Sequence, residues 1–410
     1  MRAIHADGVV IGDGDAVRDG AVVVDPLGVV QDVGPAEDVL PRSVGASVER
    51  IRGVVLPGLV NAHTHLELSA LRGQVPGGAG FVSWVEQLIG ARLEAHPEAD
   101  AAAIDRAVDE LDAFGTVAVG EVTNSLAAVR SLARRGFVGC IFHEVFGVDR
   151  RSVERRIGEL ARIVEEHVGD WPTRQLAYAP TPHTLYTTHE SAVRRLLHEA
   201  RIRRVRVSIH LAEHAHERRF LETGDGPVAA WYAQRLKLSP ETFEFPGKSP
   251  IAFAQDVGAL EADVLCVHLT DARPDELHIL AQRHVPTVFC PRSNLFIEMR
   301  LPPLLAARSA GLRPALGTDS LASNASLDVL AEARALADRF PTVPAGELLG
   351  MATWQGARAL GRMDVGRIVR GARPGLLSIE GQVDGDPCRF VLAHVREPRR
   401  WLVRRQEVST

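Results

Sequence analysis

The chain has 410 residues, 46% hydrophobic and 24% charged, so it can bury a large core and is too long for one average domain. A formal charge of -5 at pH 7 argues against a basic surface for nucleic acid. There is no 18-residue apolar stretch and no signal-peptide pattern at the start, so we expect a cytoplasmic protein without a membrane partner.

The two ends of the chain share one pattern. Residues 1–56 alternate short valine-rich runs with glycine and aspartate turns, which is typical of short β-strands. Short strands and turns return in residues 366–410. We therefore predict one small β-sandwich-like domain assembled from both ends, flanking a central domain of residues 57–365.

The central domain alternates apolar, strand-like runs with stretches of helical period. One helical stretch ends at Gly115, as a helix C-cap does. Apolar runs that are each followed by a helix indicate parallel strands buried on both faces, and eight such units form a (β/α)8 barrel, an α/β fold. Residues 222–250 are predicted to form a long loop. The predicted strands span residues 58–65, 116–122, 138–145, 176–182, 205–213, 264–270, 286–293 and 313–319.

Residues that can bind a metal fall at the predicted C-terminal ends of strands, where barrels of this kind carry their active sites. His63 and His65 end the first strand, and side chains two residues apart on a strand point to the same side. His210, His268 and Asp319 end the fifth, sixth and eighth strands. The four cysteines are widely separated, which argues against a thiolate site. Imidazoles with one carboxylate suit Zn²⁺ or a similar divalent cation.

The motifs around these residues resemble those of the amidohydrolase superfamily, in particular its cytosine- and adenosine-type deaminases. "PGLVNAHTHLELS", "HLAEH", "CPRSN" and "GTDSLASN" follow the order that this superfamily has. The resemblance implies that Glu213 is a proton shuttle and that His268 is a catalytic histidine. It also implies one divalent metal ion, with zinc first and iron or manganese as alternatives, and these metal ligands: His63, His65, His210 and Asp319.

The chemistry of the residues supports the same roles. A bound divalent cation lowers the pKa of water toward about 7, so hydroxide is available at neutral pH. Asp319 can accept the water's proton and remain a ligand, while Glu213 is placed to protonate a ring nitrogen. His268 can stabilise the developing charge on oxygen. The alternatives are a surface carboxylate for Glu213 and a core histidine for His268.

The scarcity of lysine distinguishes between subclasses. Superfamily members with two bridged metals commonly use a carboxylated lysine at the end of a middle strand. Lys237 and Lys248 are the only lysines in the chain, and the fourth predicted strand has none. We therefore predict a single metal. His183 lies at that strand end, where it either contacts the substrate or bonds to loop carbonyls.

Further candidates for substrate contact follow other strand ends. Glu67 and Arg72 come just after the first pair of histidines, where they either bind substrate or support the loop. Ser293 and Asn294 follow the seventh strand and either shape the pocket or support the eighth-strand aspartate. Glu144 ends the third strand, where it lines the pocket or packs inside the barrel. A second set is predicted to be structural: Trp84 packs in a helix, and His214 faces a loop or solvent.

The sequence thus predicts a metal-dependent hydrolytic deaminase of an amino-substituted heterocycle. The motifs look most like those of aminofutalosine deaminases, which act on a 6-aminopurine nucleoside of menaquinone biosynthesis, and Arg72 is expected to meet a substrate carboxylate. Guanine, cytosine or S-adenosylhomocysteine-type deaminases and chlorotriazine-type hydrolases remain alternatives. A non-catalytic scaffold is a further alternative, and a homodimer is expected.

Overall fold

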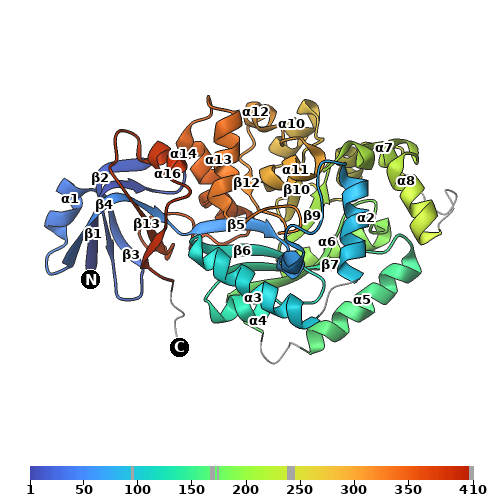
Figure 1. The fold of residues 1–410 in the computed structure, drawn as a ribbon, viewed down its shortest axis with the longest axis horizontal. Helices are drawn as coiled ribbons and strands as arrows, with labels where there is room; N and C mark the ends of the chain where they lie inside the picture. The colour runs from blue at the N-terminus through green and yellow to red at the C-terminus, as the bar shows by residue number, and fades with distance from the viewer. Residues whose placement is uncertain (94–96, 167–170, 173–174, 238–244, 406–410) are drawn as a thin grey trace.

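Strands from both chain ends form one six-stranded sheet in a computed structural model, which describes residues 1–93, 97–166, 171–172, 175–237 and 245–405. This sheet lies at one end of the molecule, with the blue N-terminal strands beside red β13 (Figure 1). Its order is β14-β13-β4-β1-β2-β3. The strands are β1 Arg2–Val10, β2 Ala16–Val24, β3 Val30–Pro35, β4 Ser47–Pro57, β13 Leu376–Glu380 and β14 Arg400–Val403.

The described strands of this unit make one sheet rather than the two layers of a sandwich. Helix α1 (Ala36–Arg42) provides the missing cover, because its Val39 is buried against Ala3 and Val23 of the sheet. Helix α16 (Pro387–Ala393) also packs on β1, β2 and β4. The unit built from both ends is therefore confirmed, whereas its division from the barrel at residues 57 and 366 stays a prediction.

Eight parallel strands follow in chain order, as two sheets of four. The sheets meet through single parallel bridges, Thr184 with His210 and Thr64 with Asp319. All eight predicted strands are present, and the prediction of a TIM-type barrel is confirmed. Their bounds are β5 Leu59–Thr64, β6 Thr116–Thr123, β7 Val138–Val145, β8 Leu176–Pro182, β9 Val207–Leu211, β10 Val264–His268, β11 Thr287–Phe289 and β12 Ala315–Leu316.

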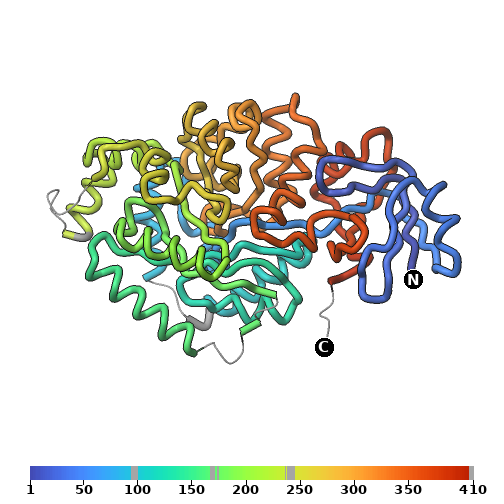
Figure 2. The backbone as a smooth tube through the Cα atoms, turned by 180° about the vertical axis from the view of Figure 1, so that it is seen from behind, coloured from blue at the N-terminus to red at the C-terminus, as the bar shows by residue number. Residues whose placement is uncertain are grey.

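Helices surround these strands, and in the view from behind the end-strand sheet lies to one side of them (Figure 2). The two parts are in contact, for example where Trp401 of β14 donates to the backbone oxygen of Asp112. None of the helices in the described part of the chain is both long and apolar enough to cross a membrane. The remaining helical segments are η1 Leu66–Leu71, α2 Phe81–Leu93, α3 Pro97–Ala113, α4 Val129–Arg134, α5 Arg150–Glu165, α6 Glu190–Arg203, α7 Ala215–Thr223, α8 Pro227–Trp231, η3 Tyr232–Leu236, α9 Pro250–Asp256, α10 Pro274–Gln282, α11 Pro291–Glu298, α12 Leu304–Ser309, α13 Val329–Arg339, α14 Ala345–Met351 and α15 Trp354–Ala359.

The prediction of a loop over residues 222–250 is wrong for its first half, where α8 and η3 form. Pro227 opens α8, where a missing backbone N–H costs nothing. Val228 and Tyr232 stand four residues apart and are both buried, as expected for one face of a helix. The glycine and proline content of the segment hid this short apolar face. Residues 238–244 lie outside the described residues.

Candidate active site

The first and eighth barrel strands are held against each other at the site. This close approach requires glycine at position 317, because a Cβ atom there would lie only 2.6 Å from the Cβ of His63, which is too close. The backbone N–H groups of Thr318 and Asp319 both donate to the carbonyl oxygen of His63, at 3.0 and 3.1 Å. The Asn61 amide also bonds to Thr318. These contacts fix Asp319 beside the first-strand histidines.

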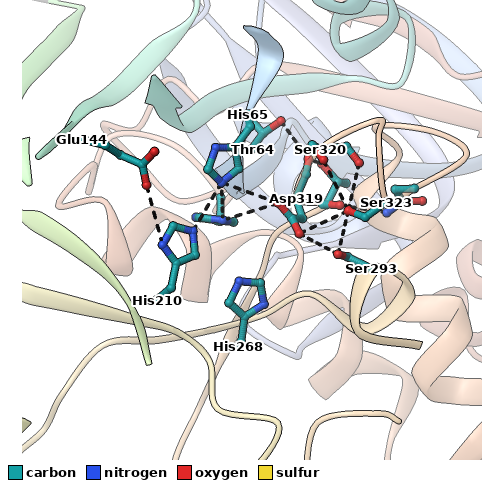
Figure 3. A network of polar contacts seen from close by, with 12 residues as sticks. Thr64, His65, Glu144, His210, His268, Ser293, Asp319, Ser320 and Ser323 are labelled. Carbon is teal, nitrogen blue, oxygen red and sulfur yellow. Dashed lines mark hydrogen bonds and ion pairs between the residues drawn. The ribbon is translucent and has the colours of Figure 1, made fainter. Parts of the chain in front are cut away.

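Four polar atoms from three strand ends converge at this point (Figure 3). The Nε2 atom of His65 lies 3.2 Å from that of His63 and 3.4 Å from that of His210. Asp319 Oδ1 lies 3.6 Å from His65 Nε2 and 3.8 Å from His63 Nε2. Ligands about 2.0–2.2 Å from one tetrahedral ion are roughly 3.3–3.6 Å apart. The atoms of His63, His65 and Asp319 therefore lie close enough together for a single divalent cation, and His210 adjoins them through His65.

The protonation states of the cluster also fit a cation. Burial lowers the pKa of His63 well below its usual value, and it lowers the pKa of His210 to about 3. Burial tends to raise the pKa of Asp319, but His65, His268 and the Ser293 hydroxyl together lower it. Neutral imidazoles and an ionised carboxylate are the forms that bind a metal.

Ser293 and Asn294, predicted either to shape the pocket or to support Asp319, contact two of the candidate catalytic residues. Ser293 Oγ donates to Asp319 Oδ2 at 2.6 Å, which leaves Oδ1 toward the histidines. Asn294 Nδ2 lies 3.2 Å from His268 Nδ1. Both side chains are buried, and neither lines the cavity. The supporting role is the one that this geometry favours.

The backbone is strained at two of these strand ends. Asp319 has φ 57° and His268 has φ 76°, a left-handed conformation that residues with a Cβ atom rarely adopt. Such strain costs on the order of 1 kcal/mol or more per residue and persists only where the surroundings impose it. Both strained residues therefore mark this end of the barrel as a functional site.

Glu213 is buried rather than a surface carboxylate. Its Oε1 atom lies 3.6 Å from His268 Nε2, and the side chain lines the cavity. Burial, followed by Asp319 and Glu217, raises the pKa of Glu213 well above its usual value. Burial lowers the pKa of His268 to about 4. A carboxyl whose protonated form is favoured and an imidazole whose neutral form is favoured thus face the same space.

A cavity of about 740 Å³ opens beside the cluster. We call one side the strand wall, because its residues follow barrel strands, and the other the helix wall, because its residues lie on α2, α5 and α8. The strand wall consists of His65, Glu144, His183, His210, Glu213, His268 and Asp319. The helix wall consists of Trp84, Val85, Leu88, Ile89, Arg92, Ser152, Arg155, Arg156, Glu159, Val228 and Trp231.

The predicted substrate-binding residues differ in what they contact. His183 lines the cavity, with its Nδ1 atom 2.6 Å from the Thr187 hydroxyl. Arg72 is not among the lining residues, because its guanidinium pairs with Glu110 on α3. Glu67 lines the cavity, but both of its oxygens are occupied by protein donors, from Thr123, Asn124, Ser125 and Arg92.

Several residues of the cavity were not identified from the sequence. Trp84 and Trp231 both line it, although Trp84 was expected only to pack in its helix.

His214 is buried rather than exposed: it caps α7, its ring stacks on Phe81, and its Nε2 atom lies 3.2 Å from the Tyr186 hydroxyl. Its position just before a helix was a signal for capping.

Comparisons with known proteins agree with the fold and site. The model of the amidohydrolase family matches residues 54–397. The chain is 29% identical over 329 residues to the aminodeoxyfutalosine deaminase of Deinococcus radiodurans, covering 77% of this chain and 75% of the relative. The structure of Helicobacter pylori aminofutalosine deaminase with methylthio-coformycin has a TM-score of 0.87, at 23% identity over 98% of each chain. An adenosine deaminase from Xanthomonas campestris with bound zinc has a TM-score of 0.78, at 25% identity over 100% of this chain and 94% of that one.

The fold and the strand-end cluster define a barrel enzyme with its site at the C-terminal ends of the strands. The chain belongs to the amidohydrolase family. This family uses a divalent metal, and zinc is bound in the related Xanthomonas structure. The predicted resemblance to this family and the prediction of an enzyme are thereby confirmed.

Proposed function

We propose that the protein is a metal-dependent hydrolytic deaminase of a 6-aminopurine nucleoside, aminofutalosine first. The observation that carries this proposal is the convergence of four ligand atoms beside Glu213 and His268 in one cavity. The deaminases named above support it, since their names refer to adenine-bearing nucleosides or their deoxy forms.

In this proposal one divalent cation, zinc first and iron or manganese as alternatives, binds to the four convergent side chains. When bound, the cation supplies the nucleophile by lowering the pKa of water toward about 7. The hydrogen bond from His210 Nδ1 to the His183 carbonyl oxygen, at 3.0 Å, leaves Nε2 for the cation. The ligands are His63, His65, His210 and Asp319.

The remaining chemistry belongs to residues around the cation. Glu213, whose raised pKa favours the protonated form, donates to a ring nitrogen and makes the amine-bearing carbon more electron-poor. Asp319 accepts one proton from the attacking water and passes it to the departing amine, and the second proton of the water returns to Glu213. One C–O bond forms, one C–N bond breaks, and ammonia leaves. His268 stabilises charge that develops on the oxygen.

The size and lining of the cavity favour a nucleoside over a bare base. A volume of about 740 Å³ suits a drug-sized molecule, and the helix wall offers mainly apolar surface to a 5′ substituent. Arg155 and Arg156 of α5 also line this wall. We therefore propose Arg155, in place of Arg72, as the side chain that meets a substrate carboxylate.

A release assay for ammonia tests the proposal. Metal-loaded protein is incubated with aminofutalosine, adenosine, S-adenosylhomocysteine, guanine, cytosine and a chlorotriazine. We expect the nucleosides to be converted faster than the free bases. Faster conversion of a free base would overturn the proposed substrate class. Release of no ammonia from any compound would overturn the proposed deaminase activity.

Three further expectations stay predictions. A cytoplasmic location is tested by cell fractionation. A homodimer is tested by light scattering of the purified protein. The division into residues 1–56 with 366–410 and residues 57–365 is tested by whether the central segment, expressed alone, unfolds in one transition.

A further inference from the structure

Glu144, at the end of β7, has one carboxylate oxygen that the protein leaves without a donor. The side chain is buried, and Oε2 accepts a hydrogen bond from Asn124 Nδ2 at 3.2 Å. Oε1 has no hydrogen-bond partner among the described residues. A buried acceptor without a partner costs about 1–3 kcal/mol, so its retention in a cavity wall indicates a ligand donor.

The groups nearest to this oxygen do not satisfy it. His210 Nδ1 is 3.7 Å away and donates to the His183 carbonyl oxygen instead. His183 Nε2 is 3.8 Å away, beyond hydrogen-bond length. Figure 3 shows Glu144 facing His210 across the edge of the candidate metal cluster. The free oxygen thus lies beside the point where a substrate must bind.

A polar network holds the Glu144 carboxylate in this orientation. Arg156 Nη2 donates to Asn124 Oδ1 at 2.8 Å, which turns the amide nitrogen of Asn124 toward Glu144 and Glu67. Arg156 Nε also donates to the backbone oxygen of Glu144 at 3.4 Å. With Oε2 fixed on Asn124, Oε1 is the oxygen presented to a ligand.

We propose that Glu144 Oε1 accepts a hydrogen bond from a sugar hydroxyl of the nucleoside and thereby selects nucleosides over free bases; this rests on the proposed function. A carboxylate only accepts, so its partner must be a donor. The 6-amino group of an aminopurine is at the reacting carbon, and its ring nitrogens are acceptors. In a 5′-substituted nucleoside the 2′ and 3′ hydroxyls are the donors that remain.

The test combines three substrates with two forms of the metal-loaded enzyme. kcat/KM is measured for adenosine, 2′-deoxyadenosine and 3′-deoxyadenosine in the wild type and in Glu144→Leu, which has similar volume and no acceptor. In the wild type, loss of the bonded hydroxyl should lower kcat/KM about tenfold to a hundredfold, as for a charge-assisted bond. In Glu144→Leu, the ratio of kcat/KM for adenosine to kcat/KM for that deoxynucleoside should fall to near one.

Two further variants keep the result interpretable. If Glu144→Leu does not fold or bind metal, Glu144→Gln retains the contact with Asn124 and should lower the ratio to a few-fold. Glu154→Gln removes an exposed acid from the same helix, α5, outside the cavity lining, and should keep the wild-type ratio.

The outcomes separate this inference from the proposed function. If the wild-type enzyme has the same kcat/KM for both deoxynucleosides as for adenosine, the role of Glu144 is overturned and the proposed function stands. The role of Glu144 is also overturned if Glu144→Leu lowers kcat/KM by the same factor for all three substrates. Glu144 would then act by positioning His183 or His210. Wild-type enzyme that releases no ammonia from any nucleoside overturns the proposed function together with this inference.

Discussion

The strand wall and the helix wall of the cavity are built differently. On the strand wall the acids, His210 and His268 are buried, and several side chains are fixed by short bonds, such as the one from Ser293 to Asp319 at 2.6 Å. On the helix wall, Arg92 is 46% exposed, and its neighbours are mainly apolar. In the proposed function, rigid polar groups carry out the reaction, whereas apolar surface with exposed cations selects among substrates.

This difference predicts how variants should behave. A change on the strand wall acts on the reacting atoms and should affect every substrate alike, except at Glu144, which is proposed to contact the sugar. A change on the helix wall should affect only those substrates that carry the matching group. Comparing several substrates for each variant therefore tests the division, and the expected effects below run from the largest to the smallest.

The largest effect is expected from loss of the cation. Asp319→Ala and His65→Ala should each lower kcat/KM roughly a thousandfold or more for all nucleosides, since the nucleophile depends on the cation. Elemental analysis should find about one divalent ion per chain in the wild type and less in both variants. Chelation should reproduce the loss, and zinc should reverse it. Full occupancy in both variants would show that the four residues do not bind the metal.

Glu213→Gln should have the next largest effect, about a hundredfold to ten-thousandfold in kcat, because general acid catalysis is lost. Metal content should stay at the wild-type level, since Glu213 is not a proposed ligand. The loss should be the same for adenosine and for 5′-substituted nucleosides. A wild-type rate in this variant contradicts the shuttle.

Ser293→Ala removes the hydroxyl that donates to Asp319 Oδ2. Contacts of this kind to metal ligands are typically worth about tenfold to a hundredfold in metal affinity. We therefore expect weaker zinc binding, measured by competition with a chelating dye, and activity that returns at high zinc concentration. Activity that stays low at saturating zinc would point to a direct role in the reaction.

Much of the strand wall was predictable because its residues follow strands directly. Period-two alternation placed His63 and His65 on one side of a strand, and the barrel rule placed His210, His268 and Asp319 at the same end. What could not be predicted was the partner of each side chain. Ser293 and Asn294 were expected either to shape the pocket or to support Asp319, and the sequence could not choose between the two because strand-to-helix geometry decides which way such residues point.

The helix wall was largely missed, because its residues depend on how connecting segments fold back over the barrel. Arg72 is close in sequence to the first ligand pair, but the turn η1 directs it to Glu110. Arg155 and Arg156 are distant in sequence from any motif, and only the packing of α5 brings them to the cavity. Sequence proximity to a motif is therefore weak grounds for predicting a substrate contact.

A smaller and more selective effect is expected on the helix wall. Arg155→Met should lower kcat/KM roughly tenfold for a nucleoside with a carboxylate on its 5′ arm and leave adenosine nearly unchanged, since Arg155 is exposed. Arg72→Met is the matched control, because it removes the same charge outside the cavity lining. An equal loss on both substrates for Arg155→Met would contradict the division between the walls.

The smallest expected effect concerns stability rather than catalysis, at a residue that supports the strand wall. Glu217 is buried and accepts hydrogen bonds from the backbone N–H groups of Ala212 and Glu213, at 3.1 and 2.8 Å. Burial raises its pKa to about 8. An exposed glutamate in the unfolded chain titrates near 4.3, so the folded state holds the extra proton between these two values.

That difference sets the sign of the pH dependence. A raised folded-state pKa means that the contribution of Glu217 to stability is fully present below about pH 4 and is lost as the pH rises toward 8. Glu217→Gln cannot lose a proton and keeps an amide oxygen as acceptor. Its Tm should therefore fall less than that of the wild type between pH 5 and pH 8, by a few degrees, in thermal unfolding at both pH values. Because every other titrating group is common to both proteins, equal decreases in Tm would mean that Glu217 is not protonated in the fold.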